Sequence, residues 1–291
     1  MKGIVRIVVS IMLLALVFAG GALAQQQYPP QQPPAQPPKA PPGQFGIPGT
    51  PAATTELAPP SPEEVAAHKA ITDAQAKKAK GVDELIRLGE GFVKKFPESR
   101  FNSAVFASLA AAYQSVNREA DMFRAGEKSL ELNPDQIDAL SLMAWVTPRR
   151  LNQDDLALAQ KLQKSEEYGK RCLQILEELV KPETIDEVEF TTSRNEKLSM
   201  CHSGLGLVFL YTDRFADSAA ELEKATTLTL NPEPTDFFVL GRAYDLLKRF
   251  HDAVAAYEKC SEKFSAVQAS CKQLLAAAKK QAATQLAPPK P

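Results

Sequence analysis

Few residues in this chain are of a type that could carry reactive chemistry. It holds three histidines and four cysteines, Cys172, Cys201, Cys260 and Cys271. The neighbours Cys201 and His202 combine a thiol with an imidazole, the groups that bind zinc or form a reactive thiolate. Adjacent residues of a helix do not face each other, however. The spacings Cys-x-x-Cys and His-Glu-x-x-His do not occur in the sequence. We therefore predict no metal site and no catalytic residues.

Nucleotide and nucleic-acid chemistry are also disfavoured. The pair Gly204 and Gly206 has no third glycine after it and no strand pattern before it, so it does not match a phosphate-binding loop. The formal net charge is −1, with both signs interspersed, and binding to a phosphate backbone needs a basic surface. We expect no cofactor, no nucleic acid and no enzymatic activity.

The N-terminus has the three regions of a secretory signal segment. Lys2 and Arg6 precede an apolar run over 7–19, and small residues follow, with Ala22 and Ala24 placed for cleavage after Ala24. Residues 1–24 are therefore predicted to be removed, leaving a periplasmic or secreted chain. The alternative is an uncleaved membrane anchor, because residues 4–24 are almost long enough to span a bilayer.

A stretch rich in proline and glutamine, residues 25–62, follows the signal segment. It has too few large apolar side chains to offset the entropy of folding, so we predict a disordered, semi-rigid linker. The alternative is that it binds an aromatic-lined groove or associates with the cell wall. Residues 286–291 are predicted to form a second disordered tail.

An internal repeat dominates the remaining sequence. A large residue, a leucine, a small residue and an aromatic recur at i, i+3, i+4 and i+7, which places them on one face of a helix. The three sets are Phe106, Leu109, Ala110 and Tyr113; His202, Leu205, Gly206 and Phe209; and Phe237, Leu240, Gly241 and Tyr244. A second apolar helix follows each set, with Ala253 and Tyr257 in the last one, and Pro134 ends the second helix of the first.

This pattern resembles the tetratricopeptide repeat, with Gly206 or Gly241 at the family's glycine position and Pro134 at its closing proline. The resemblance implies an all-α, right-handed superhelical solenoid of helix-turn-helix repeats. It covers residues 63–285, about four to five repeats, with an insertion near 148–162 and a capping helix over 266–285.

Tetratricopeptide solenoids generally bind extended peptides or partner helices on their concave face. In this repeat frame the groove positions are Gln114, Trp145, Arg149, Ser203, Phe238, Arg242 and Asp245. Trp145 and Arg149 are of the residue types most enriched at binding hot spots. The alternative is that the insertion folds back and buries Trp145.

The repeat frame also suggests a pairing for the cysteines. Cys172 and Cys260 lie on the inter-repeat face of a second helix, and Cys201 and Cys271 lie near the start of the helix that follows. In an oxidising compartment this predicts the disulfides Cys172–Cys201 and Cys260–Cys271. The alternative is four buried, reduced thiols.

Together these features predict an exported adaptor or scaffold that binds a protein or peptide partner through its concave face, in cell-envelope assembly or export. The competing hypothesis is a structural spacer that associates with the cell wall through residues 25–62, while the repeats form a homo-oligomer.

Overall fold

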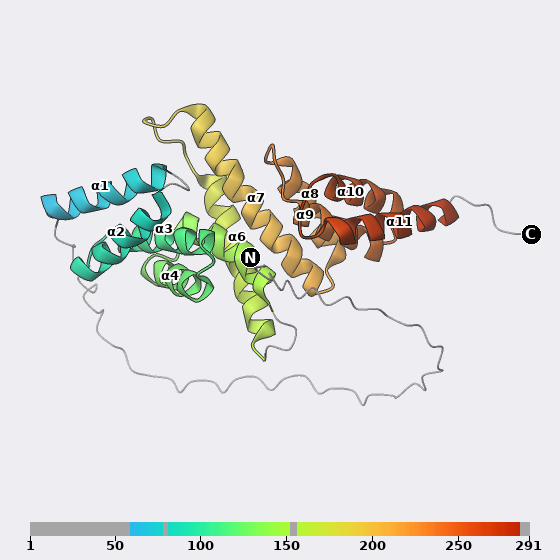
Figure 1. Cartoon of the computed structure of the whole chain (residues 1–291), viewed down its shortest axis with the longest axis horizontal. Helices are drawn as coiled ribbons and strands as arrows, with labels where there is room; N and C mark the ends of the chain where they lie inside the picture. Colours follow the sequence, from blue (N-terminus) through green and yellow to red (C-terminus); the bar gives the residue numbers. More distant parts are fainter. Residues whose placement is uncertain (1–58, 78–80, 152–155, 286–291) are drawn as a thin grey trace, which may run out of the picture. The chain divides into compact units, whose positions relative to one another are not determined.

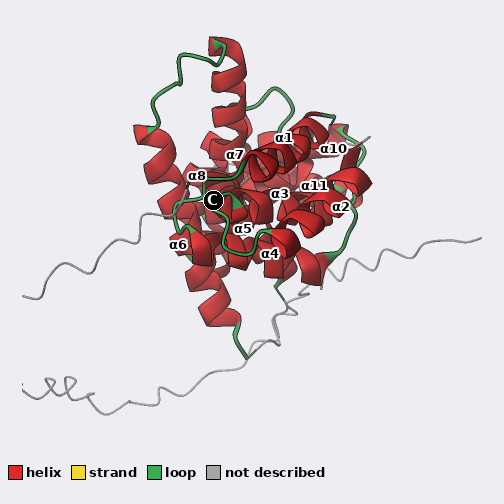
Figure 2. Ribbon diagram, turned by 90° about the vertical axis from the view of Figure 1, so that its left-hand side faces the viewer, coloured by secondary structure: helices red, strands yellow, loops and turns green. Residues whose placement is uncertain are grey.

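The computed structural model describes residues 59–77, 81–151 and 156–285, and every segment described there is a helix, a turn or a loop (Figure 2). The predicted signal segment, nearly all of the predicted linker, and the C-terminal tail lie outside these residues. The helices are α1 (Pro62–Ala76), α2 (Val82–Lys95), α3 (Asn102–Ser115), α4 (Glu119–Leu132), α5 (Ile137–Val146), the short 3-10 helix η2 (Thr147–Arg150), α6 (Leu158–Glu178), α7 (Glu187–Tyr211), α8 (Phe215–Thr227), α9 (Pro234–Leu246), α10 (Phe250–Glu262) and α11 (Gln268–Gln285). The prediction of an all-α repeat domain is confirmed.

The repeat frame corresponds to antiparallel helix pairs. Helix α3 packs on α4, α7 on α8 and α9 on α10, while α11 covers the last pair by packing on α10 (Figure 1). The small residue of the frame faces the second helix of its own pair. A Cβ atom added at Gly241, for example, would lie 2.4 Å from the ring of Tyr257. The close approach of the two helices therefore depends on this position.

Local signals mark the start of the first helix. Ser61 accepts a hydrogen bond from the backbone N–H of Glu64 at 3.1 Å, and Pro62 occupies the first turn. The repeat frame did not locate the start of α7. The frame starts at His202, but α7 begins at Glu187, where the carboxylate of Asp186 caps the helix by accepting from the N–H of Val188 at 2.8 Å. The N-terminal half of α7 therefore extends beyond the neighbouring helix pairs, as Figures 1 and 2 show.

A recurring turn joins the two helices of three pairs. An aromatic residue lies in the last turn of the first helix, an arginine five residues later immediately precedes the second helix, and an aspartate follows three residues after the arginine. The guanidinium lies over the aromatic ring and also binds the aspartate. The three sets are Tyr113, Arg118 and Asp121; Phe209, Arg214 and Asp217; and Tyr244, Arg249 and Asp252.

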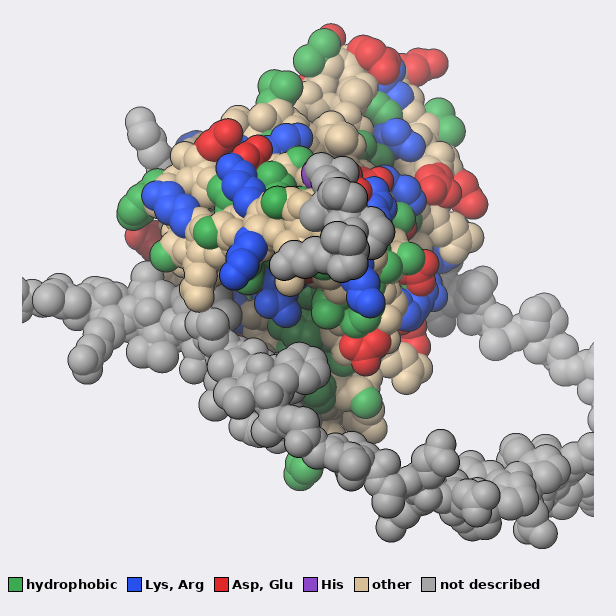
Figure 3. All heavy atoms as spheres, turned by 90° about the vertical axis from the view of Figure 1, so that its right-hand side faces the viewer, with side chains coloured by type: hydrophobic (Ala, Val, Ile, Leu, Met, Phe, Trp, Pro, Cys, Tyr) green, Lys and Arg blue, Asp and Glu red, His purple; other side chains and the backbone are tan. Residues whose placement is uncertain are grey.

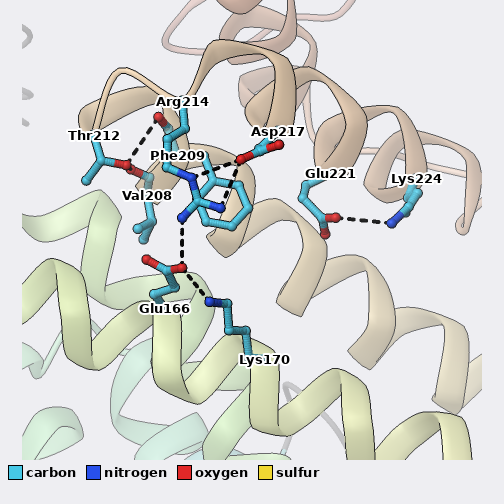
Figure 4. A network of polar contacts seen from close by, with 9 residues as sticks. All are labelled: Glu166, Lys170, Val208, Phe209, Thr212, Arg214, Asp217, Glu221 and Lys224. Carbon is cyan, nitrogen blue, oxygen red and sulfur yellow. Dashed lines mark hydrogen bonds and ion pairs between the residues drawn. The ribbon is translucent and has the colours of Figure 1, made fainter.

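The same turn links each pair to the preceding one. Arg214 reaches back to Glu166 on α6 at 2.9 Å while its guanidinium lies 3.9 Å from the centre of the Phe209 ring (Figure 4). In the other two turns the tyrosine hydroxyl donates to a glutamate of the preceding second helix, and for Tyr113 and Glu90 this distance is 2.7 Å. These contacts set the position of one hairpin on the next.

The two cysteine pairings expected from the frame are the ones in the structure. Cys172 on α6 bonds to Cys201 on α7, and Cys260 on α10 bonds to Cys271 on α11, with Cα–Cα distances of 6.4 Å and 5.9 Å. All four side chains are fully buried. Each bridge joins consecutive antiparallel helices, so the second one holds the capping helix on the last repeat.

The surface over α10 and α11 carries both signs of charge. Figure 3, which shows this end of the molecule, has Lys and Arg side chains interspersed with Asp and Glu and with scattered apolar side chains. Among the described residues, no helix is both long enough and apolar enough to cross a bilayer.

Candidate functional site: a groove around Trp145

A groove of about 850 Å³ lies where α5, α7 and the start of α9 meet. Its volume falls within the range of about 300–1,000 Å³ that is usual for ligand-binding clefts. The residues that line it include Gln114 of α3, Leu142 and Trp145 of α5, Thr191, Asn195, Glu196, Ser199, Met200 and Ser203 of α7, and Thr227, Leu228, Leu230, Glu233 and Asp236 from the end of α8 to the start of α9.

Trp145 is half-buried at the C-terminal end of α5 and contributes to the wall of the groove. The alternative prediction was that the insertion folds back and buries this side chain; Trp145 is half-buried, and residues 152–155 of the insertion lie outside the described residues. The guanidinium of Arg149 lies 4.6 Å from the centre of the indole ring, and its Nη1 donates to the backbone carbonyl of Trp145 at 2.7 Å. The indole is therefore held in place from one side and remains available from the groove.

Arg149 does not have the role that the sequence frame gave it. Its side chain is only 14% exposed and forms an ion pair with Asp236 at 2.8 Å, across 87 residues of sequence. Ser203 donates a hydrogen bond to the same carboxylate. Because η2, α7 and α9 meet at this point, the guanidinium is enclosed by protein and is not available to a ligand in the groove. Arg149 belongs to the layer that supports the groove.

Burial dominates the electrostatics of this buried pair. It raises the pKa of the Asp236 carboxyl group above its ordinary value, and the nearby charge of Glu233 raises it further, whereas Arg149 and Ser203 lower it. Burial lowers the pKa of Arg149, and the same two carboxylates oppose that shift. Each charge therefore depends on the other, as expected for an ion pair removed from water.

The structure brings together three of the seven predicted groove residues. Gln114, Trp145 and Ser203 line the groove. The other predicted residues of α9 do not: Phe238 packs against the apolar core, Asp245 accepts a hydrogen bond from Tyr257 at 2.7 Å, and Arg242 is exposed elsewhere on α9. The prediction that Phe238, Arg242 and Asp245 of α9 line the groove is corrected, because only the first turn of α9, at Asp236, reaches it.

Sequence reasoning missed the wall formed by the first half of α7 and the loop after α8. Thr191, Asn195 and Glu196 precede the repeat frame, and Leu230 lies in the loop between α8 and α9. A signal for the first wall was present, since Asp186 followed by Glu187 and Glu189 is a typical helix start. No signal placed this wall opposite Trp145, because that position depends on how α7 packs across α5.

The groove offers surfaces for binding. It presents an indole face, aliphatic and thioether side chains, hydroxyl and amide groups, and carboxylates. His202 lies outside its lining and pairs through Nδ1 with Glu221 at 2.6 Å, as a partly buried contact between α7 and α8. Within the described residues, no three His, Cys, Asp or Glu side chains are grouped so that they could hold a metal ion.

Comparison with known proteins agrees with the fold. No family model and no curated protein sequence matches this chain. Among solved structures, PilW, described as a widely conserved type IV pilus biogenesis factor, superposes with a TM-score of 0.52 at 14% identity, covering 77% of this chain and 89% of that one.

Two further solved structures are similar over much of the chain. They are a thermophilic tetratricopeptide protein in Thermus thermophilus, with a TM-score of 0.47 at 15% identity over 74% of this chain and 99% of that one, and a mutant of MamA, with a TM-score of 0.45 at 15% identity over 69% and 96%. At such identities the likeness shows the fold alone. The described residues have a fold of the tetratricopeptide type.

Proposed function

We propose that this chain is a non-catalytic scaffold that binds a segment of a partner protein in the groove around Trp145. The observation that carries the proposal is the position of the only tryptophan of the chain, half-buried in the wall of a groove of about 850 Å³. Aromatic side chains in such positions supply large contact areas, and tryptophan is among the residues most enriched at binding hot spots.

The layer around the groove supports this proposal because it is held by contacts that do not depend on a ligand. The ion pair of Arg149 with Asp236 joins η2 to α9, and Ser203 of α7 hydrogen-bonds to the same aspartate. Cys172 and Cys201 join α6 to α7. A groove that is already ordered loses less conformational entropy when a partner binds.

The setting that we propose is the cell envelope, in assembly or export. This part rests on the signal segment predicted over residues 1–24, with cleavage after Ala24 giving a periplasmic or secreted chain. The two disulfides suit an oxidising compartment. PilW, whose fold this chain shares, is described as a type IV pilus biogenesis factor, so a fold of this kind serves in the assembly of one surface structure.

The test is crosslinking in cells followed by mass spectrometry, with variants chosen by exposure. Leu230 is 98% exposed at the groove, and Phe264 is 97% exposed in the loop between α10 and α11. Trp145→Ala and Leu230→Ala should each lose the partner, whereas Phe264→Ala, which removes a similarly exposed apolar side chain outside the groove, should retain it. Far-UV circular dichroism should show that all three variants are folded.

A partner that crosslinks equally to all three variants would contradict binding in the groove. Crosslinks confined to further copies of this chain or to the cell wall would instead support the structural spacer, with residues 25–62 as its attachment.

A further inference from the structure

We propose that the partner segment is extended and presents a lysine or arginine side chain to the carboxylates of Glu196 and Glu233. This inference rests on the proposed function and specifies the chemistry of its ligand. Glu196 lies on the α7 wall and Glu233 at the first turn of α9, so the two carboxylates come from different elements that line the same groove.

The charged side chains that line the groove all carry negative charge. Among the described residues that line it, three are acidic and none is a lysine or an arginine. The nearest cations on α7 bind other groups: Lys197 pairs with Asp138 at 3.1 Å, and Arg194 donates to the carbonyl of Leu176 at 2.8 Å. They leave the acidic groups of the groove without a counter-charge from this helix.

Arg149 forms an ion pair with only one of the three carboxylates. Its ion pair is with Asp236, whose side chain is only 3% exposed, while the charges of both Glu233 and Asp236 act on the guanidinium. Glu196 and Glu233 are exposed, and within the described residues neither forms an ion pair. Glu233 also makes no capping hydrogen bond to α9. Two carboxylates therefore remain available to a ligand.

The apolar part of the groove determines where the cation would bind. Arg149 already covers one face of the indole of Trp145, so the aromatic ring is not free to take a second cation on that face. Trp145, Met200 and Leu230 instead offer apolar contacts, and Thr191 and Asn195 offer hydrogen bonds to an extended backbone. A suitable segment alternates apolar and uncharged polar residues around one cationic residue, and an acidic residue in its place would be repelled.

The single tryptophan provides a direct assay, because intrinsic fluorescence of the purified protein reports on Trp145 alone. The probes are pools of end-blocked peptides that lack tryptophan, have randomised flanks, and carry Lys, Gln or Glu at a fixed central position. The lysine pool should bind most tightly. Replacing Lys by Gln should weaken binding by about fivefold for each partly exposed ion pair that is lost, and the Glu pool should bind more weakly still.

Two variants and a control locate the charge. Glu196→Gln and Glu233→Gln should each weaken binding of the lysine pool by about fivefold and leave the Gln pool unchanged. Glu262→Gln, a change of the same charge on the exposed surface of α10, should have no effect. Raising the ionic strength should reduce the preference for lysine, since salt screens exposed charges.

Failure of this inference can be distinguished from failure of the proposed function. If pools with Gln or Glu change the Trp145 fluorescence at the same or lower concentration than the lysine pool, the groove binds peptides but does not select a cation, and the inference is overturned. If no pool changes the fluorescence and the partner crosslinks equally to Trp145→Ala, the groove is not the binding site and both proposals fail.

Discussion

Gly204 is the position at which the packing of the fold and the shape of the groove are most directly coupled. It lies in the C-terminal half of α7, facing the backbone of α5. A Cβ atom at this position would lie 2.2 Å from the carbonyl oxygen of Ala144 and 3.2 Å from the backbone nitrogen of Trp145. The substitution Gly204→Ala therefore adds one methyl group between two helix backbones that are already in contact.

The loss of unfolding free energy in Gly204→Ala depends on how far the backbones of α5 and α7 must move apart. Ordinary contacts of a Cβ atom begin near 3.4 Å, so α5 and α7 must separate by more than 1 Å, and a helix backbone cannot rotate away as a side chain can. Overpacking of this kind costs up to about 3 kcal/mol, and we take the upper end because both partners are backbone atoms. Alanine in a helix recovers about 1 kcal/mol relative to glycine. The expected net loss of unfolding free energy is about 2 kcal/mol.

The assay is urea unfolding followed by far-UV circular dichroism, with Gly91→Ala as the matched control. Gly91 lies on the exposed face of α2, and a Cβ atom there would meet nothing within 4 Å. This variant should gain about 0.5–1 kcal/mol from helix propensity alone. Trp145 should also change its fluorescence in Gly204→Ala, because the indole follows directly after Ala144. A Gly204→Ala protein as stable as Gly91→Ala would refute the close packing of α5 on α7.

Three further predictions concern charges, protons and disulfides. Asp236→Asn should lower the unfolding free energy by about 3–5 kcal/mol, because Arg149 would stay buried without its counter-charge; thermal or urea unfolding measures this, and a near-neutral change would contradict a buried ion pair. Burial and the hydrogen bond to a carboxylate raise the pKa of Tyr113 to about 12, so between about pH 10 and pH 12 the folded state keeps a proton that an unfolded tyrosine loses, and the unfolding free energy should fall as the pH rises through this range. Tyr113→Phe should make the unfolding free energy less dependent on pH there. An ultraviolet titration of the wild type in which all tyrosines ionise near pH 10 would count against the raised pKa. Peptide mapping without reduction should recover Cys172 linked to Cys201, and reducing this bridge should cost about 3–4 kcal/mol by the loop-entropy relation; free thiols on both residues would rule the bridge out.

The helix pairs could be predicted from sequence because their determinants are local and repeated. The spacing of Phe237, Leu240, Gly241 and Tyr244 defines one face of a helix, and the same spacing recurs in two other pairs. The turn that holds each pair was also readable, as an aromatic residue followed by an arginine five positions later and an aspartate three after that. This signal identifies Arg118, Arg214 and Arg249 as residues that hold the repeats together.

The groove could be predicted only in part, because a repeat frame gives the direction of a side chain and not its surroundings. Trp145 and Arg149 lie one helical turn apart, and the repeat frame predicts that both side chains line the groove. In the structure one lines the groove while the other is enclosed by Ser203 and Asp236. The difference arises from the approach of α9, which is separated from Arg149 by more than eighty residues of sequence.

Stacked helix pairs could be predicted for the described part of this chain from local patterns alone, since apolar periodicity, small residues at close contacts and helix caps act within a few turns of chain. The tertiary structure was needed to show that the first half of α7 lies opposite Trp145, that Arg149 supports the groove, and that Glu196 and Glu233 line the same groove without an ion pair to a described residue. These features depend on the angle and register at which separate repeats pack, and those follow from the summed contacts of many side chains rather than from any local pattern.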